Sequence, residues 1–473
     1  MRVHNPARAA AFLSAAGLLL AGCSLAPPYT APTTAAPPSY KEAAAGWTAA
    51  TPLDAVPRGQ WWSIFGDPVL DGLEGRIEGA SPTLAAALAR YDQARAAVGV
   101  AQADQSPTLV ANGSGGRTRA AALRPLGSGS SVTYNDVSVG ATLDYELDLW
   151  GRVRNSVRAS RADSAASAAD LAAVRLSLQA SLGDAYFRLR GFDAQAELLR
   201  QTVAAYTRAR DLTTTRHAGG IASGLDVSRA DNLLSDAKAQ ISDVANQRAA
   251  VEHEIAVLVG EVASSFAIAP TVRPLDPPGV ATGVPSQLLQ RRPDVAEAER
   301  RMAAANFRIG VARAAFYPSL SLGASGGFEA TSGSLFSAAA SYWALGPAAA
   351  LLTIFDGGRN RAQLRISRAQ YEETSADYRS TVLTAFREAE DNIAATRNLA
   401  AQAIDQRDAA SAAERTRELA LTRYRDGASD YLDVVTAQTA ALDAERATLA
   451  VQTLRMQTAV ALVRALGGGY VAS

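Results

Sequence analysis

The stretch from Val137 to Arg152 reads VSVGATLDYELDLWGR, and its residues alternate between apolar and polar or small side chains. The two sets are Val137, Val139, Ala141, Leu143, Tyr145 and Leu147, and Ser138, Gly140, Thr142, Asp144, Glu146 and Asp148. A period of two predicts a β-strand with two different faces. From Arg152 the chain has neither Pro nor Gly until Gly183, which favours a long helix. We therefore expect a two-faced strand that runs directly into a helix.

The composition excludes several classes of function. Lys and Arg together number 46, as do Asp and Glu, so no excess of positive charge indicates a nucleic-acid partner. One Cys excludes a disulfide framework and a Cys-based metal cluster, and three His leave little for a metal site. We expect no catalytic residues, no metal site and no cofactor, and no nucleic acid among the partners.

The N-terminus has the features of an export signal. Arg2 and Arg8 precede a short apolar run, residues 9–20, and LAGC follows at residues 20–23. This resembles a bacterial lipoprotein signal, in which Cys23 receives a covalent lipid; the alternative is an ordinary secretory signal with an incidental Cys. No later apolar run reaches the ~20 residues of a membrane-spanning helix, so any passage through a membrane must use strands.

Three pairs of segments match at nearly the same offset, which predicts that a unit of about 210 residues occurs twice. The pairs are VGVAQADQSPTLVANGSGG (98–116) with IGVARAAFYPSLSLGASGG (309–327), WGRVRN (150–155) with GGRNRA (357–362), and GGIASGLDV (219–227) with DGASDYLDV (426–434). Each unit has the order helix, Pro, strand, Gly/Ser-rich loop, strand, long helix, Gly-marked tip and helix.

These patterns divide the chain into six parts. They are a lipoprotein signal peptide (1–22), a lipid-anchored tether (23–60), a first repeat (61–260) with a β-hairpin at about 107–149 and a tip near 217–226, a linker (261–290), a second repeat (291–466) with a β-hairpin at about 318–355 and a tip near 424–433, and a C-terminal tail (467–473).

Both repeats contain an unusually long helical pattern, at residues 152–217 and 359–425. At 1.5 Å per residue, each would be roughly 100 Å long. Compact domains rarely use helices of more than about 20 residues. The alternative is several shorter helices interrupted at Gly183 and Gly191.

The strands and the membrane constrain each other. Four two-faced strands cannot close a barrel, because the smallest membrane barrels have about eight. Unpaired strand edges cannot face lipid, because each unsatisfied backbone group costs several kcal/mol. Several chains must therefore share one barrel, with the apolar faces toward lipid and the polar faces lining a pore. Two copies would give a small, filled barrel, and three would give about twelve strands and a lumen.

Five motifs carry a resemblance to a known family over nearly the whole mature chain. They are WWSIFGDPVLDGL (61–73), LDYELDLWGRVRN (143–155), PSQLLQRRPDVAEAE (285–299), YPSLSL (317–322) and IFDGGRNRAQL (354–364). The chain resembles TolC-type outer-membrane efflux channels, in particular their NodT-like lipoprotein branch. The resemblance implies a mainly α fold with a membrane β-barrel portion. Each chain of a homotrimer would supply four β-strands to a shared 12-stranded barrel, joined to a long α-helical periplasmic barrel.

The resemblance also implies partners. An inner-membrane efflux pump of a tripartite, RND-type system would deliver substrates through a periplasmic adaptor protein, and outer-membrane lipid would surround the strands. Two other functions remain as alternatives: a lipid-anchored scaffold or adhesin without a pore, and the adaptor itself. A scaffold gives no reason for two-faced strands, and the adaptor lacks the duplicated strand and helix unit.

The resemblance places function at the tips. It implies that an acid at Asp433 contributes to a ring at the closed entrance, where three copies would concentrate negative charge and favour cations. Asp430, Tyr424, Asp226 and Arg425 are the other candidate gate residues, and the candidate adaptor contacts are Gly220, Ser223, Gly427 and Ser429. The alternative for Asp226 and Asp433 is that an acid in a first helical turn caps the helix.

The family's closed tip is also tethered by a Tyr and an Arg that reach the Asp of the first repeat. Tyr424 and Asp226 match two of these positions, but Ser429 stands where the Arg is expected, and Thr436 replaces a second ring acid. Arg423 or Arg425 would then have to supply the missing cation.

One pattern is typical of an enzyme. GASGG (323–327) satisfies G-x-S-x-G, the motif of a nucleophilic Ser, but Ser325 lies within an alternating strand rather than a strand-turn-helix. His217, beside the first tip, is explained by the preference for a cation at a helix C-terminus.

Overall fold

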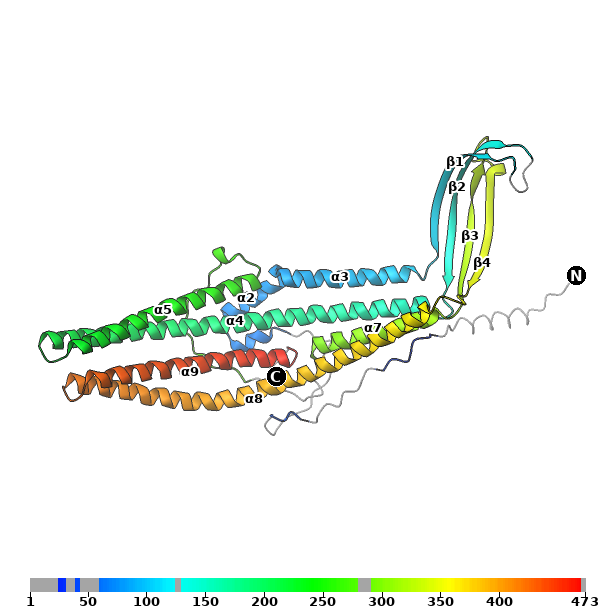
Figure 1. Ribbon diagram of the computed structural model, residues 1–473. Helices are drawn as coiled ribbons and strands as arrows, with labels where there is room; N and C mark the ends of the chain where they lie inside the picture. Colours follow the sequence, from blue (N-terminus) through cyan, green and yellow to red (C-terminus); the bar gives the residue numbers. More distant parts are fainter. Residues whose placement is uncertain (1–23, 31–38, 43–58, 124–128, 280–290, 469–473) are drawn as a thin grey trace. The chain divides into compact units, whose positions relative to one another are not determined.

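The computed structural model describes residues 24–30, 39–42, 59–123, 129–279 and 291–468, which are mainly helical with one four-stranded sheet (Figure 1). The predicted fold class is thus confirmed in its helices and its four strands. The predicted signal peptide, Cys23, most of the tether and residues 280–290 of the linker lie outside the described residues. The chain divides into two compact units. Unit 1 comprises Met1–Thr33, Arg90–Ala168 and Glu297–Tyr378, and unit 2 comprises Thr34–Ala89, Ala169–Ala296 and Arg379–Ser473.

Both repeats contain a helix, two strands, a long helix and a shorter helix in the same order, and the first repeat begins with the additional elements η1 and α2. In chain order, the elements are η1 (Trp61–Phe65), α2 (Pro68–Ala80), α3 (Pro82–Ala103), β1 (Thr108–Ala120), β2 (Val132–Leu147), α4 (Arg152–Ala218), α5 (Gly224–Leu258), η2 (Ala263–Ser265), α7 (Pro293–Ala314), β3 (Ser319–Ala330), η3 (Ala338–Ala340), β4 (Ser341–Leu351), α8 (Arg359–Arg425) and α9 (Tyr431–Ala465). None of the helices within these described residues is both long and apolar enough to span a membrane.

In the first unit the strands form an antiparallel sheet in the order β1-β2-β3-β4 (Figure 1). Leu143 of β2 pairs with Leu109 of β1 on one side and with Ala324 of β3 on the other. This register brings the apolar side chains of neighbouring strands onto one face of the sheet, because strand side chains alternate. Val137 and Val139 on that face are 41% and 42% exposed. The described part of the chain therefore leaves these side chains of the face uncovered.

The opposite, polar face is shaped by glycine at the centre of the sheet. Gly140 of β2 pairs with Gly327 of β3, and the hydroxyl of Tyr342 from β4 lies 2.5 Å from where a Cβ on Gly140 would stand. A Cβ on Gly327 would collide with the carbonyl oxygen of Val139 and the Cα of Gly140. The close contact between β2 and β3 thus needs glycine at position 327.

Gly327→Ala is expected to weaken the sheet by roughly 1–3 kcal/mol, since the added methyl must displace backbone atoms of the next strand. Heating in detergent followed by semi-native electrophoresis would show folded protein lost at lower temperature. Gly326→Ala is the matched control, because its Cβ would meet Tyr342 O at an ordinary 3.5 Å on the other face. Equal melting of the two variants would contradict this account of the glycine pair.

In the second unit the helices form two hairpins, α4 with α5 and α8 with α9 (Figure 1). The long helices have 67 residues each and the short ones 35 each, so the hairpins of the two repeats have the same length. The alternative of several shorter helices is wrong, because α4 continues through Gly183 and Gly191. These glycines admit side chains of α9: a Cβ would lie 3.3 Å from Val460 at Gly183 and 2.5 Å from Thr453 at Gly191.

The WWSIFGDPVLDGL motif forms the main core of this unit. Trp61, Leu70 and Ile77 are buried against α4 and α5. Asp67 caps α2, accepting hydrogen bonds from the backbone of Val69 and Leu70. The hydroxyl of Tyr186 on α4 donates to the Asp67 carboxylate at 2.6 Å, so one aspartate joins the cap of α2 to the long helix.

Glu74 lies on the buried face of α2 and is 0% exposed. Neither of its carboxyl oxygens has a hydrogen-bond partner among the described residues. Burial, with a smaller contribution from Asp71, raises the pKa of Glu74 from 4.5 to about 9. The side chain is therefore protonated at neutral pH in the folded protein.

The stability of the chain should fall as pH rises from about 4.5 to about 9, because there the unfolded state releases the Glu74 proton and the folded state keeps it. Glu74→Gln should remove this contribution, so that Tm falls less between pH 5 and pH 8 than in wild type. Glu78→Gln is the control, since that carboxylate lies on the same helix, half exposed and 2.8 Å from Arg175. An unchanged slope in Glu74→Gln would show that the buried carboxyl does not control it.

Candidate functional site

The two hairpin tips are built alike. Tip 1 is defined as residues 216–226 and tip 2 as residues 423–433. Gly220 and Gly427 have φ of 73° and 77°, in the left-handed region that favours glycine. Five residues after the start of each tip, a backbone N–H returns to the long helix, from Ile221 to Arg216 O and from Ala428 to Arg423 O, both at 2.8 Å. Both long helices therefore end in the same glycine turn.

In tip 1, Asp226 caps its own helix. Ser223 is the N-cap of α5, its hydroxyl accepts from the Asp226 N–H at 3.2 Å, and the Asp226 carboxylate accepts from the Ser223 N–H at 3.2 Å. Arg229 lies 3.5 Å from the same carboxylate. The capping interpretation of Asp226 is confirmed, and its role in a gate stays a prediction.

In tip 2 the equivalent acids are not engaged in this way. Asp430 is the N-cap of α9 but makes no side-chain capping bond, and Asp433 lies exposed in the first helical turn. Among the described residues, neither carboxylate forms a hydrogen bond or an ion pair. The N-terminal end of α9 therefore presents two carboxylates next to its positive dipole end.

The family's tether would require a contact between Tyr424 and Asp226. In this structure Tyr424 instead contacts Tyr431 and Thr213. Its side chain is 4% exposed, its ring lies 5.1 Å from that of Tyr431, and its hydroxyl lies 3.5 Å from Thr213 Oγ1. Burial also raises the pKa of Tyr431 to about 12. The structure thus replaces the expected Tyr-Asp contact by an aromatic pair beside a threonine.

The other tip residues have local roles. Arg425 stays on its own helix, 3.5 Å from Thr422 Oγ1, and Gly220, Ser223 and Gly427 are exposed. The hydroxyl of Ser429 is buried without a hydrogen-bond partner among the described residues. His217 lies 2.9 Å from Ala222 O within tip 1.

Sequence reasoning missed Arg216, which crosses from α4 to the end of α8. Its Nη1 donates to the backbone oxygens of Tyr424 at 2.9 Å and Arg425 at 3.0 Å. The available signal was a basic residue in the last turn of a helix, where cations bond the final carbonyls.

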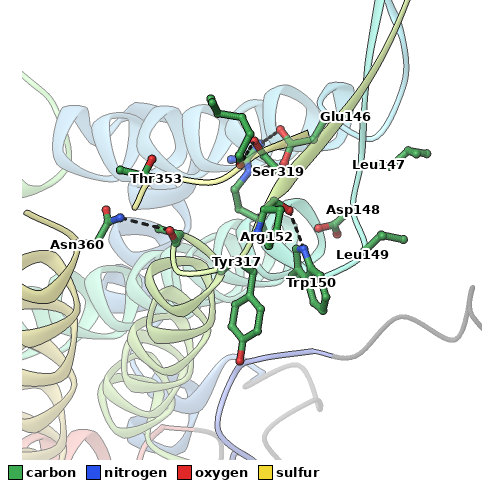
Figure 2. Close-up of a pocket in the computed structure, with 14 residues that line it drawn as sticks. Glu146, Leu147, Asp148, Leu149, Trp150, Arg152, Tyr317, Ser319, Thr353 and Asn360 are labelled. Atoms are coloured by element: carbon green, nitrogen blue, oxygen red, sulfur yellow. Dashed lines mark hydrogen bonds and ion pairs between the residues drawn. The ribbon is translucent and has the colours of Figure 1, made fainter. Parts of the chain in front are cut away.

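At the base of the sheet, the LDYELDLWGRVRN motif forms a rigid junction between β2 and α4 (Figure 2). Trp150 stacks on Tyr317 with ring centroids 4.8 Å apart and donates to Pro318 O at 2.8 Å. Arg152 forms two 2.7 Å bonds with Glu146. Asp148 accepts from the N–H groups that open α4, Val153 at 3.1 Å and Arg154 at 2.8 Å.

This junction joins the two repeats, since Tyr317 and Pro318 come from the second. Asp356 has the role of Asp148 at the start of α8, accepting from the N–H groups of Gly358 and Asn360 at 2.8 Å. Among the residues drawn in Figure 2, Arg152 pairs with Glu146, while Trp150 and Asn360 donate to the backbone oxygens of Pro318 and Ala315, which indicates a structural joint.

The first residues after Cys23 lie against unit 1. Ser24 donates to Asn155 at 3.0 Å, and the carbonyls of Leu25 and Pro27 accept from Arg313 at 3.2 Å and Asn306 at 2.9 Å. A Cβ on Gly310 would lie 2.8 Å from the backbone nitrogen of Ala26. The beginning of the predicted tether is therefore fixed to the chain.

Ser325 lies inside β3, paired with Thr142 and Ala344, and so is not on a strand-turn-helix. No group of three or more His, Cys, Asp or Glu among the described residues could hold a metal ion.

Ser223→Ala should remove the capping box and destabilise the start of α5 by about 1 kcal/mol. Amide hydrogen exchange at residues 224–226 is then expected to rise about fivefold. Ser228→Ala serves as control, because that hydroxyl donates to Gly224 O within the helix and caps nothing. Equal exchange in the two variants would show that the box does not hold tip 1.

The chain is similar to known proteins over most of its length. The model of the outer membrane efflux protein family matches residues 75–261 and 284–468. Outer membrane protein OprJ of Pseudomonas aeruginosa is 34% identical over 457 residues, 96% of this chain and 94% of the relative. Antibiotic efflux pump outer membrane protein ArpC of Pseudomonas putida is 32% identical over 461 residues, 97% and 95% of the two chains.

A solved structure of the outer-membrane channel OprN is similar over 94% of this chain and 99% of that one, with a TM-score of 0.88 and 30% identity. The matched residues include both hairpin repeats, and the relatives are covered almost completely. The chain belongs to the outer membrane efflux protein family.

Proposed function

We propose that this chain forms the outer-membrane channel of a tripartite, RND-type efflux system, through which substrates pass from the periplasm to the exterior. The observation that carries the proposal is the sheet with one apolar and one polar face and with an unpaired edge on both β1 and β4 in the described chain. Such edges are untenable in lipid unless other strands pair with them.

Three copies fit this requirement best. Pairing β4 of one copy with β1 of the next would close about twelve strands around a lumen, whereas two copies would give a small barrel filled by side chains. Val137, Val139 and their neighbours would then face lipid, and Thr142, Ser321 and Ser325 would face water. The family membership and the relatives named as efflux proteins support a channel of this kind.

The proposed partners are an inner-membrane efflux pump and a periplasmic adaptor protein. Helices of 67 residues, roughly 100 Å long, suit a conduit that reaches across the periplasm. Gly220, Ser223 and Gly427 are exposed at the tips, where an adaptor would bind, and Ser429 lies beside them. The relative named as an outer membrane protein of an antibiotic efflux pump supports a pump as partner.

We further propose a covalent lipid on Cys23 as the membrane anchor. The contacts of Ser24, Leu25 and Pro27 with unit 1 support it, because they would hold a lipid on the preceding residue at a defined place on the chain. No cofactor, catalytic residue or nucleic acid is part of the proposal.

The gate of the channel is proposed to be a ring of Asp430 and Asp433 from three copies. Both lie at the positive end of α9 without side-chain partners in the described structure, so their charge would act on passing ions. Asp226, held in its capping box, would then stabilise tip 1, and Tyr424 and Arg425 would support tip 2 from the end of α8.

Single-channel conductance in a planar bilayer tests the proposal, using protein whose mass in detergent corresponds to a trimer. Wild type should show a small conductance that prefers cations. Asp433→Ala should lower the ratio of cation to anion permeability, because it removes one charge per copy from the ring. Asp92→Ala, an exposed acid on α3, should leave that ratio unchanged.

Absence of conductance from folded, inserted wild-type and Asp433→Ala protein would overturn the channel. It would favour the lipid-anchored scaffold or adhesin without a pore.

A further inference from the structure

Arg216 joins the two hairpin tips of one chain. From the last turn of α4, its Nη1 donates to the carbonyl oxygens of Tyr424 at 2.9 Å and Arg425 at 3.0 Å. The last carbonyls of a helix lack a partner in a following turn, and a cation there also opposes the negative end of the helix dipole. Arg216 of the first hairpin thus supplies a hydrogen-bond donor to the last carbonyl groups of α8 in the second hairpin.

The same guanidinium is held by an aromatic ring. Its central carbon lies 4.8 Å from the centroid of Tyr424, a distance typical of a cation–π contact. Tyr424 is itself buried with Ala230, Tyr431 and Val434, which come from α5 and α9. The position of Arg216 is therefore coupled to the packing of both hairpins at the tips.

We propose that Arg216 is a positioning residue that clamps tip 1 to tip 2 and thereby fixes the start of α9 with its two acids. The clamp takes the place of the Tyr-Asp tether, because the Asp226 carboxylate is occupied by Ser223 and Arg229. The inference about Arg216 depends on the proposed channel only where it concerns conductance. The effect of the clamp on the tips follows from the contacts themselves.

Loss of the clamp would not separate the hairpins. Nε of Arg216 is buried with no hydrogen-bond partner among the described residues, so part of the cost of desolvating the cation is not recovered. Farther from the tips, the hairpins are joined independently. These bonds are Tyr206 to Gln438 O at 3.2 Å, Arg446 to Gln240 at 3.1 Å and Gln457 to Asp184 at 2.7 Å.

Amide hydrogen exchange of the full trimer tests the clamp directly. Arg216→Ala should raise exchange at residues 424–431 at least fivefold, while exchange around Gln438 and Gln457 stays at the wild-type level. Arg216→Lys should be intermediate, because an ammonium keeps the charge but lacks the planar group that lies on Tyr424. Arg208→Ala, an exposed residue on the same helix, should change nothing.

Conductance provides the second readout. Arg216→Ala should raise the single-channel conductance at least twofold at unchanged Tm, and Arg216→Lys should restore part of the wild-type value. This partial restoration separates positioning from a loss of folding.

Wild-type exchange at residues 424–431 in Arg216→Ala would overturn the clamp, whatever the conductance. If Arg216→Ala does not assemble, Arg216→Lys decides: intermediate exchange supports the clamp and wild-type exchange overturns it. A wild-type protein without conductance would instead refute the proposed channel, and exchange would still decide the clamp.

Discussion

The backbone groups along the two edges of the sheet need hydrogen-bond partners, and the rest of the molecule depends on this constraint. Within the described chain, β2 and β3 are paired on both sides, while β1 and β4 are paired on one side. An outer membrane protein cannot leave these edges to lipid, because nothing there can satisfy the backbone groups. The single chain is therefore an incomplete structure, and the apolar face around Val139 acquires a function only once the edges are closed.

A second constraint is that the long helices must pack closely against one another, and small residues make this packing possible. Gly183 and Gly191 would be expected to weaken α4, since each costs up to about 1 kcal/mol in a helix interior. Here they admit Val460 and Thr453 from α9, so the cost in propensity is offset by contact between helices. Glycine has the same effect in the sheet, where Gly140 makes room for the ring of Tyr342 and Gly327 makes room for the backbone of β2.

Much of the fold could be predicted because its signals are local or repeated. Alternation around Leu143 indicated the strand and its two faces, and the match between residues 219–227 and 426–434 indicated equivalent tips. The contacts of Arg216 could not be predicted in this way, since its acceptors lie 208 and 209 residues away and are backbone atoms, which carry no sequence signal. Glu74 is an intermediate case: it falls on the same helical face as Leu70 and Ile77, but periodicity alone does not tell a buried carboxyl from a boundary residue.

The two tips show how duplicated sequences diverge in local structure. Ser223 aligns with Asp430, and each is an N-cap; Asp226 aligns with Asp433, and each lies in the first turn that follows. A Ser N-cap lets the following acid fold back and close a capping box. An Asp N-cap would bring two carboxylates together, and like charges disfavour that closure. The difference between Ser223 and Asp430 at the N-cap therefore explains the two structures. Asp226 of tip 1 bonds to its own helix, whereas Asp430 and Asp433 of tip 2 make no such bond at the start of α9.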